Sequence, residues 1–159
     1  MQVAYKNINY KHLKDIEYVS SQVFKVPYVY HKKTIKGYLL VHGLKLGYVA
    51  LVENKVIGYI LMTVVDNQRI IASIGVLPDL QGQGIGNQLL KLAVNDNQFE
   101  NIYLHVRVSN KPAIKLYEKN GFKILNTIEA YCLDVEPNED AYYMMLEKKS
   151  LPQIKHLRF

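Results

Sequence analysis

The sequence contains no tryptophan and a single cysteine, Cys132, among its 159 residues. One cysteine excludes an internal disulfide and a zinc site built from several cysteines, and it favours a reducing compartment. Apolar runs such as Tyr59 to Met62 are far shorter than the roughly 20 residues that span a membrane. The segment from Met1 to Tyr10 is polar and lacks the apolar stretch of a signal peptide. We therefore expect a cytoplasmic protein.

Acidic residues are scarcer than basic ones. The 14 Asp and Glu against 20 Lys and Arg give a formal net charge of +6. This charge suits phosphorylated cofactors, RNA or acidic surfaces without selecting among them. Apolar residues make up 49% of the chain, which is enough for a packed core. The 13 tyrosines are the most unusual excess, and a tyrosine suits half-buried grooves because it joins an apolar ring to a polar tip.

Hydrophobic periodicity predicts one domain over residues 1–148, followed by a basic tail over 149–159. The order of elements is β–α–α–β–β–β–α–β–α–β–β, which predicts an α+β fold with helices on the faces of a sheet. Asn110 is expected to cap the last helix, and Gly121 to end it in a left-handed conformation. The predicted strands cover residues 3–8, 46–52, 55–65, 69–77, 101–108, 122–128 and 141–147, and the predicted helices cover 13–23, 34–41, 84–98 and 111–120.

A glycine-rich segment, Gln81 to Gly86, joins a predicted strand directly to a predicted helix. Its glycines allow the backbone to approach a ligand closely. Free N–H groups at the start of a helix bind anions, and the helix dipole adds to the attraction. The segment therefore favours a phosphate site over a purely structural turn. It is neither a P-loop nor a dinucleotide-binding loop, because no Gly-Lys-Ser/Thr follows and Asn87 replaces the third glycine.

A second motif, Asn-x-x-Ala-x-x-Leu-Tyr-x-x-x-Gly-Phe, runs from Asn110 to Phe122. Together with Gln-x-x-Gly-x-Gly at Gln81 to Gly86, it resembles the cofactor-binding motifs of the GNAT superfamily of acyl-CoA acyltransferases. The stretch 101–106 and the residues Tyr131 and 135–137 look like N-terminal protein acetyltransferase catalytic subunits, of the NatE or archaeal type. The resemblance covers about residues 3–148.

The resemblance implies a mixed, mostly antiparallel sheet with a V-shaped splay between its central strands and helices on both faces. It also implies transfer of the acetyl group of acetyl-CoA to the α-amine of a protein or peptide N-terminus, by direct attack in a ternary complex and without a metal. The residues that would bind the cofactor lie beside the splay, in the glycine loop and on the last helix: Ile74, Gly75, Val76, Gln81, Gly82, Gln83, Gly84, Ile85, Gly86, Asn87, Asn110, Ala113 and Tyr117.

The resemblance places the peptide substrate on two loops and one strand. The apolar lining implies a first residue that is Met or small. An auxiliary subunit or the ribosome is a further expected partner, whereas DNA and membranes are not expected. Cys132 departs from the nearest relatives, which carry two adjacent tyrosines there. The expected peptide-binding residues are Val26, Pro27, Tyr28, Tyr30, Ala72, Tyr131 and Cys132.

Two residues are implied as catalytic. His105 matches a family histidine that takes the amine proton, and an imidazole with a pKa near 6.5 suits this task. Without the resemblance, a single strand histidine is more simply structural. Tyr117 matches a tyrosine that approaches the CoA sulfur, where it either protonates the thiolate or only positions it. Ile70 and Val26 stand where relatives carry accessory bases.

Two other functions stay open. The first is a GNAT enzyme that acetylates lysine or a small amine, and the second is a non-catalytic acetyl-CoA-binding subunit of an N-terminal acetyltransferase complex. An α-amine has a pKa of about 7.7–8.0 against about 10.4 for lysine, so neutralising lysine costs roughly 3–3.7 kcal/mol more. This difference favours α-amines. The missing accessory bases support the non-catalytic subunit, whereas the complete glycine loop and His105 oppose it.

Overall fold

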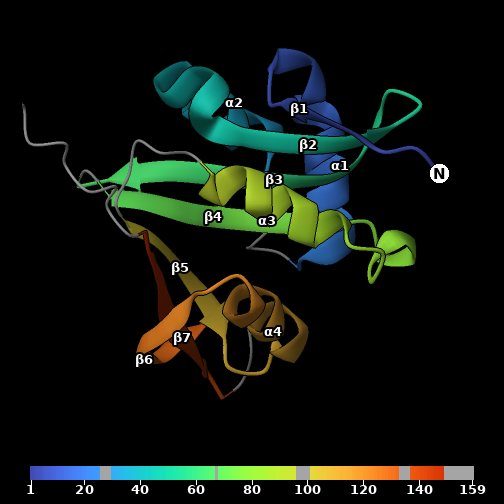
Figure 1. Ribbon diagram of the computed structural model, residues 1–159. Coiled ribbons are helices and arrows are strands. Elements are labelled where there is room, and N and C mark those ends of the chain that lie inside the picture. Colours follow the sequence, from blue (N-terminus) through green and yellow to red (C-terminus); the bar gives the residue numbers. More distant parts are fainter. Residues whose placement is uncertain (26–29, 67, 96–100, 133–136, 149–159) are drawn as a thin grey trace, which may run out of the picture.

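The computed structural model describes residues 1–25, 30–66, 68–95, 101–132 and 137–148. In these ranges one sheet has the strand order β1-β2-β3-β4-β5-β7-β6 (Figure 1). The sequence of strands and helices along the chain confirms the predicted order. The strands are β1 Ala4–Asn7, β2 Gly47–Val52, β3 Lys55–Val65, β4 Gln68–Val76, β5 Asn101–Arg107, β6 Lys123–Cys132 and β7 Glu139–Glu147, and the helices are α1 Leu13–Val23, α2 Lys32–His42, α3 Ile85–Val94 and α4 Lys111–Lys119.

Several boundaries differ from the sequence-based expectation. Helix α3 ends at Val94, with Asn95 as its C-cap, and not at residue 98. Strand β6 continues to Cys132, because pairing with β7 resumes after an irregularity beyond Ile128. Strand β7 accordingly begins at Glu139. Hydrophobic alternation fails at such an irregularity, so it could not reveal the longer hairpin. The predicted tail, residues 149–159, lies outside the described residues.

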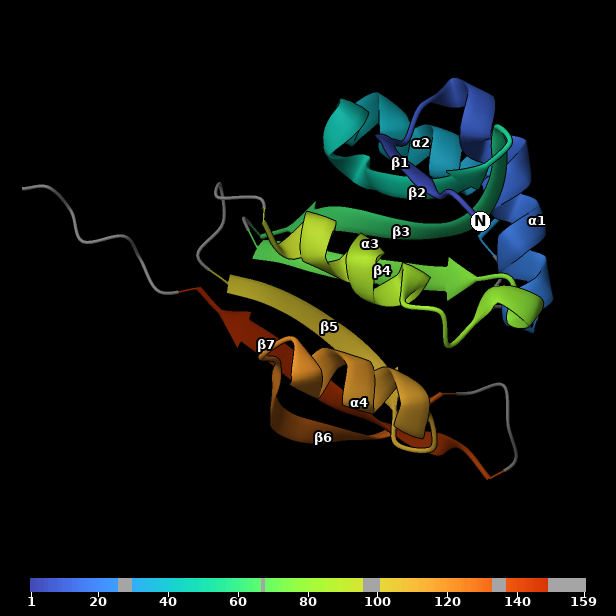
Figure 2. The ribbon, with the colours of Figure 1, turned by 45° about the vertical axis from the view of Figure 1, so that its right-hand side comes forward.

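The sheet consists of two antiparallel parts that meet at β4 and β5. Strands β1 to β4 pair antiparallel in chain order, and β7 pairs antiparallel with both β5 and β6. Among the described residues, the parallel junction has two residue pairs, Arg69 with Ile102 and Ile70 with Tyr103. Beyond these pairs β5 swings away from β4, as Figure 2 shows. This divergence confirms the expected splay between the central strands.

Two apolar clusters lie on opposite faces of the sheet. On one face, α1 and α2 bury residues such as Ile16 and Ile35 against Leu61 of β3. On the other, α3 and α4 bury residues such as Leu89 and Ile114 against β3, β4 and β5. Alternate residues of a strand point to opposite faces, so β2, β3 and β4 each contribute to both clusters. The helices thereby cover both faces of the sheet, as predicted.

Gly75 of β4 allows a close approach between this strand and Tyr59 of β3. A Cβ atom at Gly75 would lie 2.9 Å from Cε1 of Tyr59. The Tyr59 ring is fully buried, and its hydroxyl shares a 2.9 Å hydrogen bond with Oγ of Ser73. Glycine is therefore needed at position 75 for packing, whatever part its backbone has in binding a cofactor.

Candidate active site

His105 lies in the middle of β5 and faces away from α4. The neighbouring residues Leu104 and Val106 are buried in the cluster that contains Ile114 and Tyr117 of α4. Because side chains alternate along a strand, His105 projects from the opposite face together with Tyr103. Next to β5, over β3 and β4, helices α1 and α2 cover this same face of the sheet. The imidazole is half-buried there, and burial lowers the pKa of His105 below its usual value near 6.5.

The imidazole of His105 is held between two tyrosine rings. Tyr131, at the end of β6, stacks on it with ring centroids 4.8 Å apart and planes inclined by 11°. Tyr143 of β7 stacks at 4.9 Å and 27°. Tyr103 extends the column by stacking on Tyr143 at 5.5 Å. Neither Tyr103 nor Tyr143 was predicted as a site residue, although the alternation of β5 does place Tyr103 on the face of His105.

Tyr30 joins the first expected peptide loop to β4. Its hydroxyl donates a 3.2 Å hydrogen bond to the carbonyl oxygen of Ala72, and its N–H donates to Oγ of Ser20. Burial raises the pKa of Tyr30 to about 12, with further contributions from the nearby phenols of Tyr38, Tyr59 and Tyr131. The contribution of Tyr131 shows that the structure brings tyrosines of both expected peptide loops close together.

The structure says less about the other residues that are expected to bind the peptide. Val26, Pro27 and Tyr28 lie outside the described residues. The Cys132 side chain is 3% exposed, so it lies beneath the surface that Tyr131, at 45% exposure, presents to solvent. The peptide-binding role of Tyr30, Ala72, Tyr131 and Cys132 stays a prediction.

The glycine loop leaves the first turn of α3 open. Residues 81–84 are exposed, and Gly82 and Gly84 have φ values of +76° and +83°. Gly84 is the N-cap of α3, and no side chain caps the helix there. Gln81 folds the loop back onto β4, because its Nε2 donates a 3.0 Å hydrogen bond to the carbonyl oxygen of Val76. The uncapped N–H groups of this turn are suited to bind an anion.

The splay provides a second binding element beside this loop. Ile74, Gly75 and Val76 pair with β3 on one side, and no described residue of β5 pairs with them on the other. Their peptide groups on that side are therefore suited to pair with an extended, amide-containing ligand. An anion site at the end of β4, next to an unpaired strand edge, fits the diphosphate and pantetheine of acetyl-CoA.

Two asparagines of the expected cofactor set have structural partners. Oδ1 of Asn110 accepts a 3.3 Å hydrogen bond from the N–H of Ala113, which confirms the predicted cap of α4. Oδ1 of Asn87 accepts a 2.9 Å hydrogen bond from Asn120 and so links α3 to the end of α4. Gly121 has a φ of +91°, as predicted for the helix end. Any contact of Asn87 with a cofactor is therefore expected from its backbone.

Tyr117 lies on the other face of the sheet from His105. Its side chain is 5% exposed and packs in the core beside Phe122, with ring centroids 5.8 Å apart. Burial raises the pKa of the Tyr117 phenol well above its ordinary value of 10. A tyrosine at its ordinary pKa already gives a proton to a thiolate only in an uphill step, and the raised pKa makes this step harder. Tyr117 thus packs in the core, and its catalytic role stays a prediction.

Replacing Tyr117 with phenylalanine therefore tests its chemistry. We expect kcat for acetyl transfer to fall by less than about tenfold, below the 10²- to 10⁴-fold contribution of a general acid. Tyr117→Ala should instead destabilise the fold by roughly 3–5 kcal/mol, the usual cost of deleting a buried aromatic ring. Steady-state kinetics and urea unfolding measure the two effects. A hundredfold loss of kcat in a stably folded Tyr117→Phe variant would instead support the role of a general acid.

Comparison with known proteins identifies the class to which this fold and site belong. The model of the acetyltransferase (GNAT) family matches residues 12–122, and the chain belongs to this family. It is similar to the N-alpha-acetyltransferase of Saccharolobus solfataricus, with 36% identity over 134 residues that cover 74% of this chain and 75% of the relative.

Solved structures show the same similarity. Arabidopsis thaliana Naa50, in complex with the bisubstrate analogue CoA-Ac-MVNAL, superposes with a TM-score of 0.76 at 28% identity and covers 95% of this chain and 100% of its own. The ribosomal-protein-S18-alanine N-acetyltransferase of Escherichia coli gives a TM-score of 0.82 at 24% identity over 99% of this chain and 100% of its own. The second similarity shows the fold alone.

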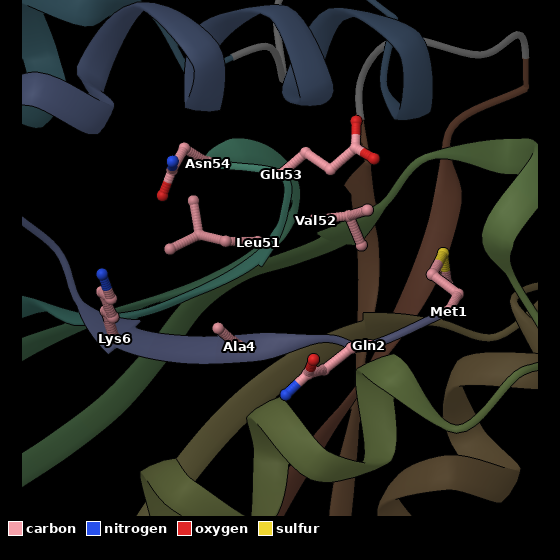
Figure 3. A pocket seen from close by; sticks show the side chains of 8 residues that line it. All are labelled: Met1, Gln2, Ala4, Lys6, Leu51, Val52, Glu53 and Asn54. Atoms are coloured by element: carbon pink, nitrogen blue, oxygen red, sulfur yellow. The ribbon is translucent and has the colours of Figure 1, made fainter.

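A separate hollow lies at the far edge of the sheet, between β1 and the β2–β3 turn (Figure 3). It has a volume of about 650 Å³, and residues such as Lys6, Leu51 and Glu53 line it. None of the predicted site residues contributes to it. Within the described ranges, no three His, Cys, Asp or Glu side chains are grouped to hold a metal ion. No helix in these ranges is both long and apolar enough to cross a membrane.

Proposed function

We propose that this chain transfers the acetyl group of acetyl-CoA to the α-amine of protein or peptide N-termini. The observation that carries the proposal is the position of His105. Its neutral imidazole lies on the diverging strand β5, on the same face of the sheet as Tyr30, Ala72 and Tyr131. The similarity to the N-alpha-acetyltransferase of Saccharolobus solfataricus supports the same reaction.

Different groups of residues carry out different parts of the acetyl transfer. Acetyl-CoA supplies the activated thioester whose carbonyl carbon the amine attacks. The uncapped amides around Gly84 hold the phosphates, and the unpaired edge at Ile74 to Val76 aligns the extended arm. His105 accepts the amine proton through an imidazole nitrogen, directly or through a water molecule, as the new C–N bond forms and the C–S bond breaks. The CoA thiolate leaves and takes up a proton from solvent. Its lowered pKa keeps the imidazole neutral and able to accept this proton at pH 7.

The surroundings of Tyr30 support a preference for an apolar first residue. Tyr30 packs with Ala72 in the apolar cluster under α1 and α2. The side chains of that cluster are apolar or aromatic. A Met side chain or a small one such as Ala or Ser can enter without leaving a buried charge.

A peptide panel tests this preference. Peptides that differ only in the first residue should be acetylated with kcat/KM at least tenfold higher for Met than for Asp or Glu. A buried unpaired carboxylate costs more than the 1.4 kcal/mol that corresponds to a tenfold change. Initial rates measured by thiol release provide the comparison. Preference for acidic first residues would contradict the proposed lining.

The position of the acetyl group in the product tests which amine this chain acetylates. A peptide with a free N-terminus and an internal lysine should be acetylated at its α-amine, and the same peptide with a blocked N-terminus should not react. Turnover of the blocked peptide would favour a lysine acetyltransferase. Acetyl-CoA binding without turnover of either peptide would favour a non-catalytic subunit.

We further propose that this reaction takes place in the cytoplasm on newly made proteins. The single cysteine is compatible with a reducing compartment. The net charge of +6 and the basic residues of 149–159 support contact with an anionic partner such as the ribosome, or with an auxiliary subunit. Co-sedimentation with ribosomes at low and high salt tests this, and salt-sensitive binding is the expected result.

A further inference from the structure

The end of β6 has an irregular backbone next to the active-site histidine. Pairing between β6 and β7 is interrupted between Ile128 and Cys132. Within the interruption, Ala130 has a φ of +51°, a conformation that residues other than glycine adopt at an energetic cost. The carboxylate of Asp140 on β7 compensates part of this cost, because its Oδ1 accepts a 2.9 Å hydrogen bond from the N–H of Ala130.

This bulge determines where Tyr131 lies. Tyr131 follows Ala130 directly, and its ring is nearly parallel to the imidazole of His105 at a centroid distance of 4.8 Å. A bulge turns side chains that regular alternation would place elsewhere. A regular strand at Ala130 would therefore change the direction of Tyr131. Asp140 and Tyr131 thus act together. The carboxylate of Asp140 fixes the backbone at Ala130, and the ring of Tyr131 covers the imidazole of His105.

The second ring reaches His105 from the opposite side. Tyr143 lies directly across the antiparallel pair from His105, and the two rings stack at 4.9 Å. Tyr103 stacks on the other side of Tyr143 and limits its movement. The column therefore runs Tyr131, His105, Tyr143, Tyr103. An imidazole between two rings has little freedom to rotate out of its plane.

We propose that Asp140 and Tyr143 are positioning residues for the acetyl-transfer reaction. Tyr143 supports the plane of the His105 imidazole from one side, and Asp140 holds the Ala130 bulge that places Tyr131 on the other. Both act through His105. The inference rests on the proposed function, because it assigns His105 the task of accepting the amine proton.

Glu139, the charged neighbour of Asp140, stabilises a different part of the sheet. Oε1 of Glu139 accepts a 2.8 Å hydrogen bond from the N–H of Ser109, and its Oε2 lies 3.6 Å from Nη1 of Arg107. Glu139 thus secures the end of β5, and Asp140 secures the end of β6. The exposed Glu129, directly before Ala130, offers a matched control.

Two pairs of variants separate positioning from general damage. Asp140→Ala removes the acceptor for the Ala130 N–H, whereas Asp140→Asn keeps an oxygen at that atom. Tyr143→Ala removes the supporting ring, whereas Tyr143→Phe keeps it. We expect the two alanine variants to lower kcat at least tenfold with an unchanged KM for acetyl-CoA, and the conservative variants to retain activity within about threefold. Glu129→Ala should resemble the wild type.

A spectroscopic readout follows the imidazole without turnover. Stacked rings shield the His105 ring protons, so their NMR signals should move downfield in Asp140→Ala and Tyr143→Ala but not in Asp140→Asn or Tyr143→Phe. The groups that face His105 are Tyr103 and Arg107 from β5, Tyr131 from β6 and Tyr143 from β7. Greater exposure in Tyr143→Ala should raise the pKa of His105 toward 6.5 and shift the acidic limb of the kcat profile upward with it.

The outcomes distinguish this inference from the proposed function. Normal kcat together with unchanged His105 signals in folded Asp140→Ala and Tyr143→Ala overturns the positioning role. Equal losses in alanine and conservative variants also overturn it, because they indicate general damage. A wild-type chain that turns over no peptide overturns the proposed function and the catalytic part of this inference, and the NMR comparison then decides whether Asp140 and Tyr143 hold the imidazole.

Discussion

Replacing His105 with alanine is expected to lower kcat/KM for peptide acetylation by about 10²- to 10⁴-fold, the usual contribution of a general base. The other titratable side chains in its stack are tyrosines, and a phenol is protonated at pH 7 and cannot accept a proton. Peptide kinetics at saturating acetyl-CoA measure the loss. His12→Gln, in the segment that precedes α1, is the matched control and should retain wild-type activity.

The pH dependence of kcat tests whether this loss is due to the imidazole of His105. Burial lowers the pKa of His105 below its usual value near 6.5. The imidazole should therefore be neutral, and able to act as a base, at pH values above this lowered pKa. The acidic limb of kcat should therefore fall below pH 6.5 in the wild type and disappear in His105→Ala. If His105→Ala retains kcat/KM at all pH values, His105 is not the base.

Replacing Gly84 with alanine is expected to raise the Kd for acetyl-CoA at least tenfold. Gly84 has a φ of +83° and a ψ of 0°, and an L-residue in this left-handed conformation costs roughly 1–2 kcal/mol. A Cβ there meets no protein atom within 4 Å, so it projects into open space beside the uncapped amides. Both the strained loop and the added methyl group should disturb an anion bound at these amides.

Titration calorimetry with acetyl-CoA measures this effect. Gln88→Ala, an exposed position in α3, is the control and should bind with the wild-type Kd. Thermal unfolding without ligand should show a loss of roughly 1–2 kcal/mol for Gly84→Ala, the cost of the left-handed conformation, because the added Cβ meets no other protein atom. Wild-type affinity in Gly84→Ala would show that the phosphates bind elsewhere.

The sequence predicted the elements well because most of them follow a simple period. The alternation from Asn101 to Arg107 and the helical spacing from Leu13 to Val23 each identify an element that the structure contains. The caps at Asn110 and Gly121 were also predictable, since their chemistry is local. The family resemblance added the splay between β4 and β5, which no periodicity reveals.

The arrangement around His105 was less accessible to sequence analysis. Tyr143 meets His105 only through the register between β5 and β7, and Tyr131 only through the bulge at Ala130. Both depend on pairing between segments distant in sequence. Likewise, only the packing of α4 shows that Tyr117 lies on the opposite face of the sheet from His105. The separate catalytic roles that the resemblance implies for these two residues stay predictions.

The central claim is that this chain acetylates α-amines through His105. Acetylation of a peptide library by the isolated chain, with the modified atom located by mass spectrometry, tests it most directly. We predict acetyl groups on the α-amines of peptides that begin with Met or a small residue, and almost none with His105→Ala. Acetylation mainly on lysine side chains, or equal α-amine acetylation by His105→Ala, would contradict the account.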